Sequence, residues 1–289
     1  MTVKRRRLPA AGIRKLEGSL FIAPWVVGFL AFMAFPLGYS LYMSFHQVRI
    51  LGTGIEIIPV GLKHYKYILL ENGAILYNQL FPFFRQSLIM IPIIIVFSLL
   101  VAIMLNQKFP GRSVFRSIFF LPVIFTTGQV VREFMTQGEG DIGFLERYNV
   151  AALVSQNLSS SWAAPIVNIM GSFVLILWYS GVQILIFLAG RQTIGSSVYE
   201  AARIDGATPW EVFWKITLPG MVPFILLNLI YTTVDLFTFP TNPILTQIST
   251  SNYGQSSALA WIYFVIILAF LGAILGIFHK VNKASGAAR

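Results

Sequence analysis

Long runs without a charged residue dominate this sequence and decide what it can fold into. The stretch from Gly18 to Phe45 holds 28 uncharged residues, and the stretch between Arg85 and Lys108 holds 22. A helix rises ~1.5 Å per residue, so about 20 apolar residues cross the ~30 Å hydrocarbon core of a bilayer. The first run also exceeds the apolar core of a signal peptide and has no evident cleavage site. Both runs therefore predict membrane-spanning helices.

Six such segments are predicted, which gives an all-α, polytopic membrane fold. With 56% hydrophobic and 11% charged residues, the chain has too little charge to cover a soluble globule of 289 residues. Residues 1–17 are interpreted as a basic cytoplasmic segment and residues 18–289 as a single transmembrane domain. The helices are expected at about 20–45, 86–107, 117–136, 164–188, 221–239 and 258–278.

The positions of the basic residues predict that both termini are cytoplasmic. Six spans put the two ends on one side, and 15 of the 21 Lys and Arg fall in segments assigned to that side, as the positive-inside rule requires. External loops are then expected at about 50–84, with an interfacial helix around residues 64–70, and at about 138–163. The net charge of +10 is explained by topology, so no nucleic-acid partner is expected. The chain is therefore expected to lie in a membrane, in contact with its lipids.

A polar insert, YEAARIDGATPWEVFWKITLP from Tyr199 to Pro219, lies between two of the apolar segments. Ser197 precedes Glu200 by three residues, which predicts a capping box, and Glu200 can pair with Arg203 one turn later. Gly206 is expected to end this short helix in a left-handed backbone conformation.

A second helix is predicted to follow directly. Thr208, Pro209 and Glu211 have the residue types of an N-cap, a first helical position and an N3 carboxylate, and Glu211 can pair with Lys215 at i,i+4. Its aromatic face can lie on the bundle or at the lipid headgroups. The positive-inside tally places the whole loop, residues 196–219, in the cytoplasm.

The insert also carries a spaced motif: Glu200-Ala201-Ala202, then Gly206 after three residues, then Ile216-Thr217-Leu218-Pro219 after nine more. This resembles the EAA loop of ABC importer permeases, and the chain resembles their carbohydrate-uptake, maltose-type branch from about Phe21 through Phe278. In that family the loop is a cytoplasmic coupling element that sits in a groove of the ATPase subunit. The resemblance implies a type I importer fold and assigns ATPase docking to Glu200, Ala201, Ala202, Arg203, Asp205, Gly206, Ile216, Leu218 and Pro219.

The resemblance implies a permease subunit that translocates a carbohydrate, with an oligosaccharide favoured, and that performs no covalent chemistry. Its implied partners are a second homologous permease, two ABC ATPase subunits and an extracytoplasmic sugar-binding protein. The sequence has no GxxxxGK[ST] phosphate-binding loop, so ATP and Mg are expected in the ATPase subunits and no cofactor in this chain. Without cysteine and with three scattered histidines, no metal site is expected.

Polar residues within the fourth and fifth predicted helices are candidates for a substrate path. On helix five they recur at i, i+3, i+4 and i+7, which puts them on one helical face, and helix four adds an i,i+4 pair. Aromatic faces with amide and carboxylate oxygens suit sugar rings, but the same residues can join helices through hydrogen bonds. Both interpretations stay open for Tyr179, Gln183, Asn228, Tyr231, Thr232 and Asp235.

Two other classes of membrane protein are alternatives to an importer permease. An ion-coupled secondary transporter would need intramembrane carboxylates and an inverted repeat, whereas only Asp235 qualifies and no repeat is found. A membrane-embedded enzyme would need catalytic groups that converge at membrane depth, and the sequence offers no such set. One departure from the resembled family is the stretch from Phe239 to Pro243, where many relatives carry a Thr-Gly-Gly-Gly-Pro-like turn.

Overall fold

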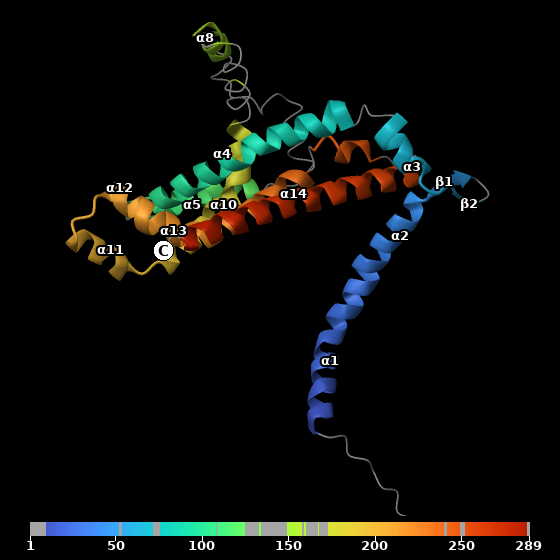
Figure 1. Cartoon of the computed structure of the whole chain (residues 1–289), viewed down its shortest axis with the longest axis horizontal. Helices are drawn as coiled ribbons and strands as arrows, with labels where there is room; N and C mark the ends of the chain where they lie inside the picture. The colour runs from blue at the N-terminus through green and yellow to red at the C-terminus, as the bar shows by residue number, and fades with distance from the viewer. Residues whose placement is uncertain are drawn as a thin grey trace, which may run out of the picture. The chain divides into compact units, whose positions relative to one another are not determined.

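The computed structural model is a mostly helical protein with one short β-hairpin (Figure 1). It describes residues 10–51, 54–71, 76–107, 109–124, 149–157, 173–239, 242–248 and 252–287, with the single positions 133, 159 and 167. The chain divides into two compact units, one of Met1–Asn72 with Ile248–Ile262 and one of Gly73–Gln247 with Tyr263–Arg289. The all-α membrane fold is confirmed, and the hairpin is the addition to it.

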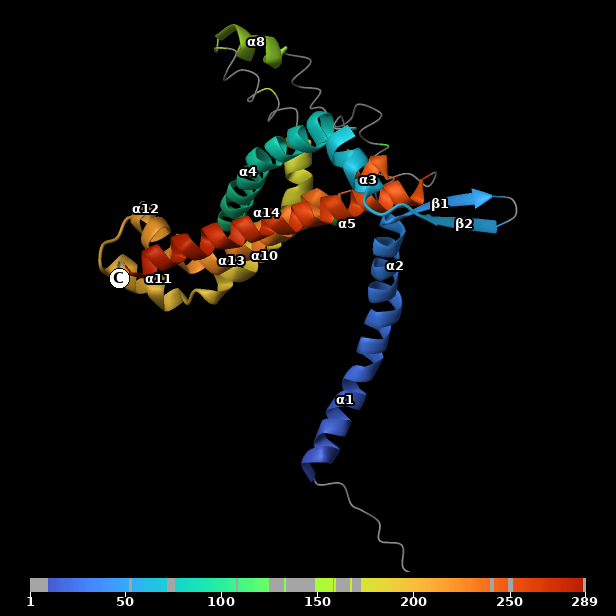
Figure 2. The same ribbon diagram turned by 45° about the vertical axis from the view of Figure 1, so that its right-hand side comes forward.

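The first unit begins with one long apolar helical run (Figure 2). It consists of α1 (Ala10–Phe29), a π-helical turn η1 (Leu30–Ala34) and α2 (Phe35–Ser44). Pro36 has no N–H to donate, so it interrupts the regular backbone hydrogen bonding at the start of α2. The π-helical turn η1 ends directly before this point. Large apolar side chains project from this run, with Phe21 84% and Trp25 82% exposed. A soluble protein would cover such a surface, and here the hydrocarbon of a bilayer covers it.

A hairpin and a short helix follow where the sequence predicted an external loop. Strands β1 (His46–Leu51) and β2 (Gly54–Pro59) pair antiparallel, with Arg49 directly opposite Glu56. Opposite charges in such a pair favour this register. The chain then forms α3 (Lys63–Lys66) and the π-helical η2 (Tyr67–Glu71), at the place of the helix expected around residues 64–70.

The second unit is a bundle of long helices. Helix α10 packs against α4, α5 and α13, and α13 also packs against α4. An aromatic cluster closes one part of this core, where the Phe237 ring lies 5.1 Å from that of Phe84 and 5.3 Å from that of Phe270. The helices of the chain from here on are η3 (Leu76–Leu80), α4 (Phe81–Asn106), α5 (Arg112–Ile124), α8 (Val150–Asn157), α10 (Phe173–Thr193), α11 (Ser196–Ile204), α12 (Pro209–Val212), η4 (Phe213–Thr217), α13 (Leu218–Thr238), η5 (Leu245–Gln247) and α14 (Tyr253–Ala287).

Five described helices are long and apolar enough to cross a membrane. They are Glu17–Ser44, Tyr77–Asn106, Leu175–Thr193, Pro209–Thr238 and Tyr253–Lys280. The predicted third helix, 117–136, coincides with α5 only up to Ile124, and most of its remainder lies outside the described residues. The same holds for most of the predicted loop 138–163 and, apart from position 167, for residues 164–172 of the predicted fourth helix. Six spans therefore stay a prediction.

Helix ends differ from the predicted ones by several residues, mostly outward. Helix one already begins at Ala10, helix four continues to Thr193, and helix six runs from Tyr253 to Ala287. Charged residues such as Lys280 bounded the prediction, but a helix continues through them because Lys and Arg are good helix formers. An uncharged run measures the apolar part of a helix and not its whole length.

The stretch that departs from the resembled family carries a polar cap for α13. Asn242 donates to the Phe237 carbonyl over 2.9 Å and to the Tyr263 hydroxyl over 2.6 Å, while its Oδ1 accepts from the Ile244 N–H. The Tyr263 hydroxyl donates to the same Phe237 carbonyl over 2.8 Å. The last carbonyls of a helix lack intrahelical partners, so Asn242 and Tyr263 satisfy one that is buried here.

Candidate functional site

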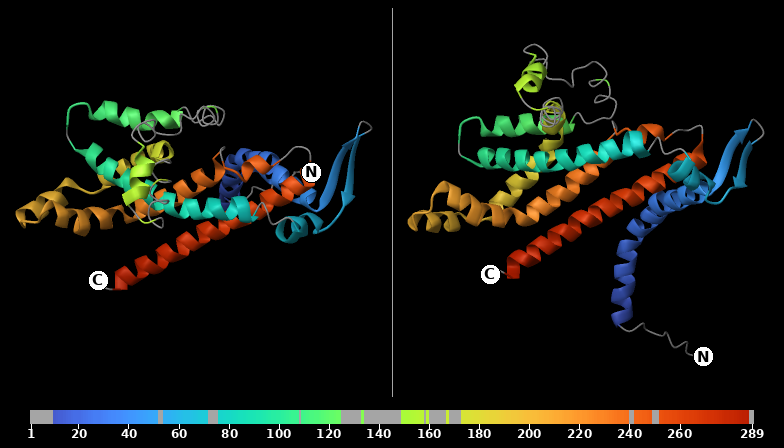
Figure 3. Two further views of the ribbon diagram at one scale, coloured as in Figure 1. Left: turned by 90° about the horizontal axis from the view of Figure 1, so that it is seen from above. Right: turned by 45° about the horizontal axis from the view of Figure 1, so that its top comes forward.

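The polar insert is a pair of short helices that joins α10 to α13 (Figure 3). Helix α11 spans Ser196–Ile204, and α12 and η4 run without a break into α13. The second helix of the insert is thus the start of the predicted fifth membrane helix.

The end of α11 is set by Gly206. Its φ is +78°, in the left-handed region that favours glycine. The Ala207 N–H donates to the Ala202 carbonyl over 2.9 Å and the Gly206 N–H to the Arg203 carbonyl over 3.1 Å. This pair of bonds is a Schellman motif, which satisfies carbonyls that the helix end leaves free. The predicted glycine stop is confirmed.

The predicted capping box at Ser197 is wrong. Helix α11 already begins at Ser196, and its N-cap is Gly195, which offers no side-chain cap. Ser197 is therefore inside the first turn, where its hydroxyl does not meet the N3 amide. No ion pair joins Glu200 to Arg203, although the structure describes both residues.

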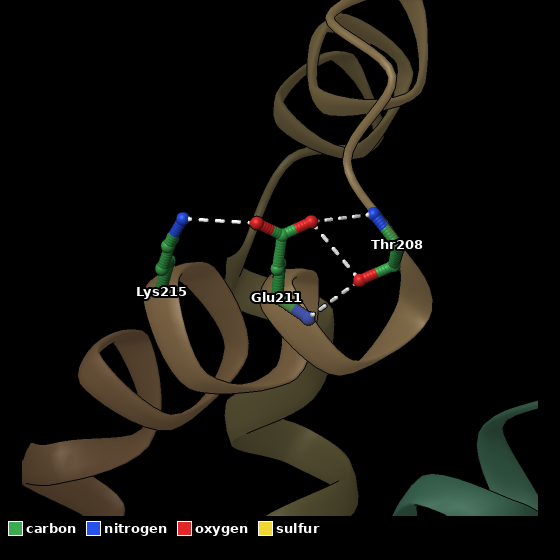
Figure 4. A network of polar contacts seen from close by, with 3 residues as sticks. All are labelled: Thr208, Glu211 and Lys215. Atoms are coloured by element: carbon green, nitrogen blue, oxygen red, sulfur yellow. Dashed lines mark hydrogen bonds and ion pairs between the residues drawn. The ribbon is translucent and has the colours of Figure 1, made fainter.

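The second start signal is confirmed in full (Figure 4). The Glu211 N–H donates to Thr208 Oγ1 over 3.3 Å, and the Thr208 N–H donates to Glu211 Oε2 over 3.0 Å. Lys215 Nζ lies 3.2 Å from Glu211 Oε1. The Glu211 carboxylate thus accepts from the Thr208 N–H and hydroxyl and pairs with Lys215, and these contacts hold the turn closed.

The side chains that the sequence assigned to ATPase docking separate into two groups. Those on α11 and its end are exposed except for Ala202, which is buried and faces the protein: Glu200, Ala201, Ala202, Arg203, Asp205 and Gly206. Those on the second helix are half-buried: Ile216, Leu218 and Pro219. The first group is thus mostly open to solvent, and the second is partly covered by the protein.

One exposed residue of this surface was missed. Ile204 is 87% exposed although it is a large apolar side chain, and Trp210 is 69% exposed. Ile204 lies on α11 among the residues assigned to docking, and Trp210 lies on α12. The signal was present in the sequence, because helical spacing puts Ile204 beside Glu200 and Ala201 at i−4 and i−3.

The base of the insert is a close helix contact. A Cβ at Gly190 of α10 would lie 2.4 Å from Cγ of Phe224 on α13, so only glycine lets the two helices approach this far. Small residues at helix contacts in membranes permit such approach. The helices that flank the insert are thereby held together where it begins and ends.

A polar cluster lies between α10 and α13 deeper in the bundle. Gln183 Nε2 donates to Thr232 Oγ1 over 3.2 Å, and Asn228 Nδ2 donates to the backbone carbonyl of Gln183 over 3.4 Å. All three side chains are fully buried. Gln183 Oε1 and Asn228 Oδ1 have no hydrogen-bond partner among the described residues. These residues join two helices and leave two acceptor oxygens unused.

The other three residues predicted for the substrate path differ in their exposure to solvent. Tyr179 is buried and its ring packs 4.8 Å from that of Phe239. Tyr231 is 37% exposed, and Asp235 is half-buried. Among the described residues no Lys, Arg or His pairs with Asp235.

Metal binding finds no support in the described part of the chain. No group of three or more His, Asp or Glu side chains there lies close enough to hold an ion.

Comparison with known families decides the class of the protein. The sequence model of one family, described as "Binding-protein-dependent transport system inner membrane component", matches residues 68–283. The chain belongs to this family. It is therefore a permease, a multi-pass transport subunit of an ABC importer in the cytoplasmic membrane.

Similar proteins agree with this assignment. The permease is 30% identical to the probable ABC transporter permease protein YesP of Bacillus subtilis strain 168, over 88% of each chain. It is 31% identical to the arabinooligosaccharides transport system permease protein AraP of the same strain, over 73% of this chain and 65% of that protein. It is 26% identical to the trehalose/maltose transport system permease protein MalF of Thermococcus litoralis, over 88% of this chain and 90% of that one.

A solved structure confirms the fold of the permease. It belongs to a bacterial ABC transporter involved in the import of the acidic polysaccharide alginate, and it superposes with a TM-score of 0.62 at 20% identity. The match covers 93% of the permease and 96% of that chain. The importer-type fold expected from the EAA-like loop is thus found.

Proposed function

We propose that this permease moves a carbohydrate, and an oligosaccharide in preference to a monosaccharide, inward across the cytoplasmic membrane. The observation that carries this proposal is the family membership together with its relatives, whose names include arabinooligosaccharides and trehalose/maltose transport. The polar and aromatic residues of α10 and α13 support it, because sugars present apolar CH patches and many hydroxyl groups.

The proposed complex contains this permease, a second homologous permease, two ATPase subunits that bind ATP and Mg, and an extracytoplasmic sugar-binding protein. The permease itself performs no covalent step and holds no cofactor. Closure of the ATPase subunits displaces α11, and the displacement reaches the membrane through the continuous helix of α12, η4 and α13. The path then alternates between outward and inward openings, as in rigid-body switching between two states.

The docking surface of this proposal is the exposed side of α11. Glu200, Ala201 and Arg203 lie there beside Ile204, so the partner groove needs an apolar floor with polar rims. Asp205 and Gly206 end the helix, Ala202 is buried on its inner side, and Ile216, Leu218 and Pro219 are assigned to the partly buried base of the insert.

The substrate path is proposed along Tyr231 and Asp235, which are accessible, with Tyr179 behind them. The two unused oxygens of Gln183 and Asn228 can accept hydrogen bonds from sugar hydroxyls that reach them. Thr232 is assigned to the helix contact, since its hydroxyl is taken by Gln183. Neither an ion-coupled transporter nor a membrane enzyme gains support from the family.

The substrate class is tested with the purified complex in proteoliposomes. ATP hydrolysis is measured after addition of its binding protein with neutral mono-, di- and oligosaccharides, and with amino acids and divalent cations as other substrate classes. The proposal expects stimulation by one or a few oligosaccharides. Stimulation by an amino acid or a metal ion, with none by any sugar, would contradict it.

A further inference from the structure

Tyr199, in the first turn of α11, contacts both helices that the insert connects. Its hydroxyl lies 3.2 Å from Thr217 Oγ1, at the end of η4, and the Arg191 guanidinium carbon lies 3.9 Å from the centroid of its ring. Arg191 belongs to the last turn of α10, and Thr217 directly precedes α13. One side chain thus links α11 to the end of one membrane helix and to the start of the next.

The environment of Tyr199 suits a rigid link. Thr217 is buried, Tyr199 and Arg191 are half-buried, and Ala202, one turn after Tyr199, is buried on the same inner face. A hydrogen bond shielded from water competes less with solvent, so its loss is felt more strongly. The outer face of α11 stays free for a partner.

We propose that Tyr199 is the positioning residue that transmits movement of α11 to α10 and α13. The inference rests on the proposed function, because the partner that moves α11 is the ATPase subunit. A push on the exposed face of α11 is carried to α13 through the hydroxyl contact with Thr217, and to α10 through the ring contact with Arg191. Without these links the short helix can tilt while the membrane helices stay behind.

The two links can be separated chemically. Tyr199→Phe removes the hydroxyl contact and keeps the ring, while Thr217→Val removes the same contact from the other side. If the hydroxyl contact carries the coupling, the double variant is no worse than either single variant, because both delete one interaction. Arg191→Gln deletes the ring contact, so its effect adds to that of Tyr199→Phe.

The test follows the membrane helices in the assembled transporter. Spin labels are attached at Leu88→Cys on α4 and Thr238→Cys on α13, both exposed positions in a chain without cysteine. Pulsed electron paramagnetic resonance measures their separation before and after addition of ATP with orthovanadate. We expect Tyr199→Phe and Thr217→Val each to lower the ratio of shifted to unshifted molecules roughly 2- to 10-fold, the range of one net hydrogen bond.

Thr193→Val is the matched control. It also removes one hydroxyl near the insert, but this hydroxyl bonds only to the Gly190 carbonyl within α10, over 2.7 Å. The control should respond to ATP with orthovanadate as the parent does, and all variants should co-purify with the ATPase subunits.

Three results would overturn the role of Tyr199: parent-like shifts in both hydroxyl variants, losses that add in the double variant, or failure of both variants to assemble. A parent complex that does not respond to ATP with orthovanadate would instead contradict the proposed coupling itself. The failure of this inference is thus distinguishable from the failure of the proposed function.

Discussion

Gly206 holds a backbone conformation that other residues adopt only with strain. Its φ of +78° closes α11, and a Cβ there would meet open space within 4 Å, so conformation and not crowding is the constraint. A left-handed conformation costs a non-glycine residue roughly 1–2 kcal/mol, and a β-branched one more. That is too little to unfold a membrane bundle but enough to misdirect a short helix.

We therefore expect Gly206→Val to reach the membrane in normal amounts and to lose substrate-stimulated ATP hydrolysis. Both are measured on the complex, by quantifying the permease in membranes and by ATPase assay in proteoliposomes. Gly276→Val is the control, since Gly276 also has open space around it but has no positive φ. Wild-type stimulation in Gly206→Val would show that the turn is not needed for coupling.

Asp235 and Thr232 lie one turn apart on α13, and we expect their substitution to have different effects. Asp235→Ala should lower uptake of the stimulating sugar by roughly 10-fold or more, because a hydrogen bond to a charged group contributes about 1.5–3 kcal/mol. Thr232→Val should lower the thermal stability of the complex, since it breaks the contact with Gln183. Uptake and the unfolding temperature are measured for both variants.

Asp235→Asn refines this test because it keeps the shape and most of the hydrogen bonding of the side chain. Normal uptake by Asp235→Asn would exclude a role for the charge. Loss of assembly in Asp235→Ala would make this residue part of the helix contact and contradict the assignment of a substrate path.

At the scale of elements, the contact between α10 and α13 depends on Gly190. Gly190→Ala puts a methyl group into the Phe224 ring, and such overpacking typically costs 1–3 kcal/mol. We expect a lower unfolding temperature in detergent, partly restored by Phe224→Leu. Gly272→Ala should be neutral or slightly stabilising, since nothing lies within 4 Å of its added Cβ. Equal effects of the two alanine substitutions would contradict the close contact.

Local signals in the sequence predicted the structure of the insert well, whereas they predicted the contacts between helices poorly. The capping box of Thr208 and Glu211 and the stop at Gly206 depend on residues a few positions apart, so the sequence contains all their parts. The predicted box at Ser197 was wrong because such a residue pair forms a capping box only at the N-cap position, and the N-cap of α11 is Gly195, two residues earlier.

The contacts that a residue makes with other helices were visible only in the structure. The periodicity of α13 put Asn228, Thr232 and Asp235 on one face. It could not show that Asn228 and Thr232 form hydrogen bonds with Gln183, or that Asp235 stays half-buried. The β-hairpin was missed for a similar reason, because a single pair of short strands next to apolar helices has a weak pattern.

For the whole molecule, the basic residues predict the direction of every crossing. Reporter fusions at Gly195 and after Lys283 should report the cytoplasm, and fusions near Gly52, Gln156 and Ser249 the outside. The reason is the bias of Lys and Arg toward the cytoplasmic side. A cytoplasmic signal at Gln156 would contradict the six-span topology.

The central claim is that the insert from Tyr199 to Pro219 couples this permease to an ATPase. This is tested by co-purification of the ATPase subunit with wild-type and Glu200→Lys permease, because Glu200 is exposed on α11 and we expect its charge reversal to preserve the fold. Lys280→Glu, a charge reversal of equal size on α14, is the control. We expect the ATPase subunit to stay with the wild type and the control and to be lost from Glu200→Lys; equal retention by all three would contradict a coupling role of the insert.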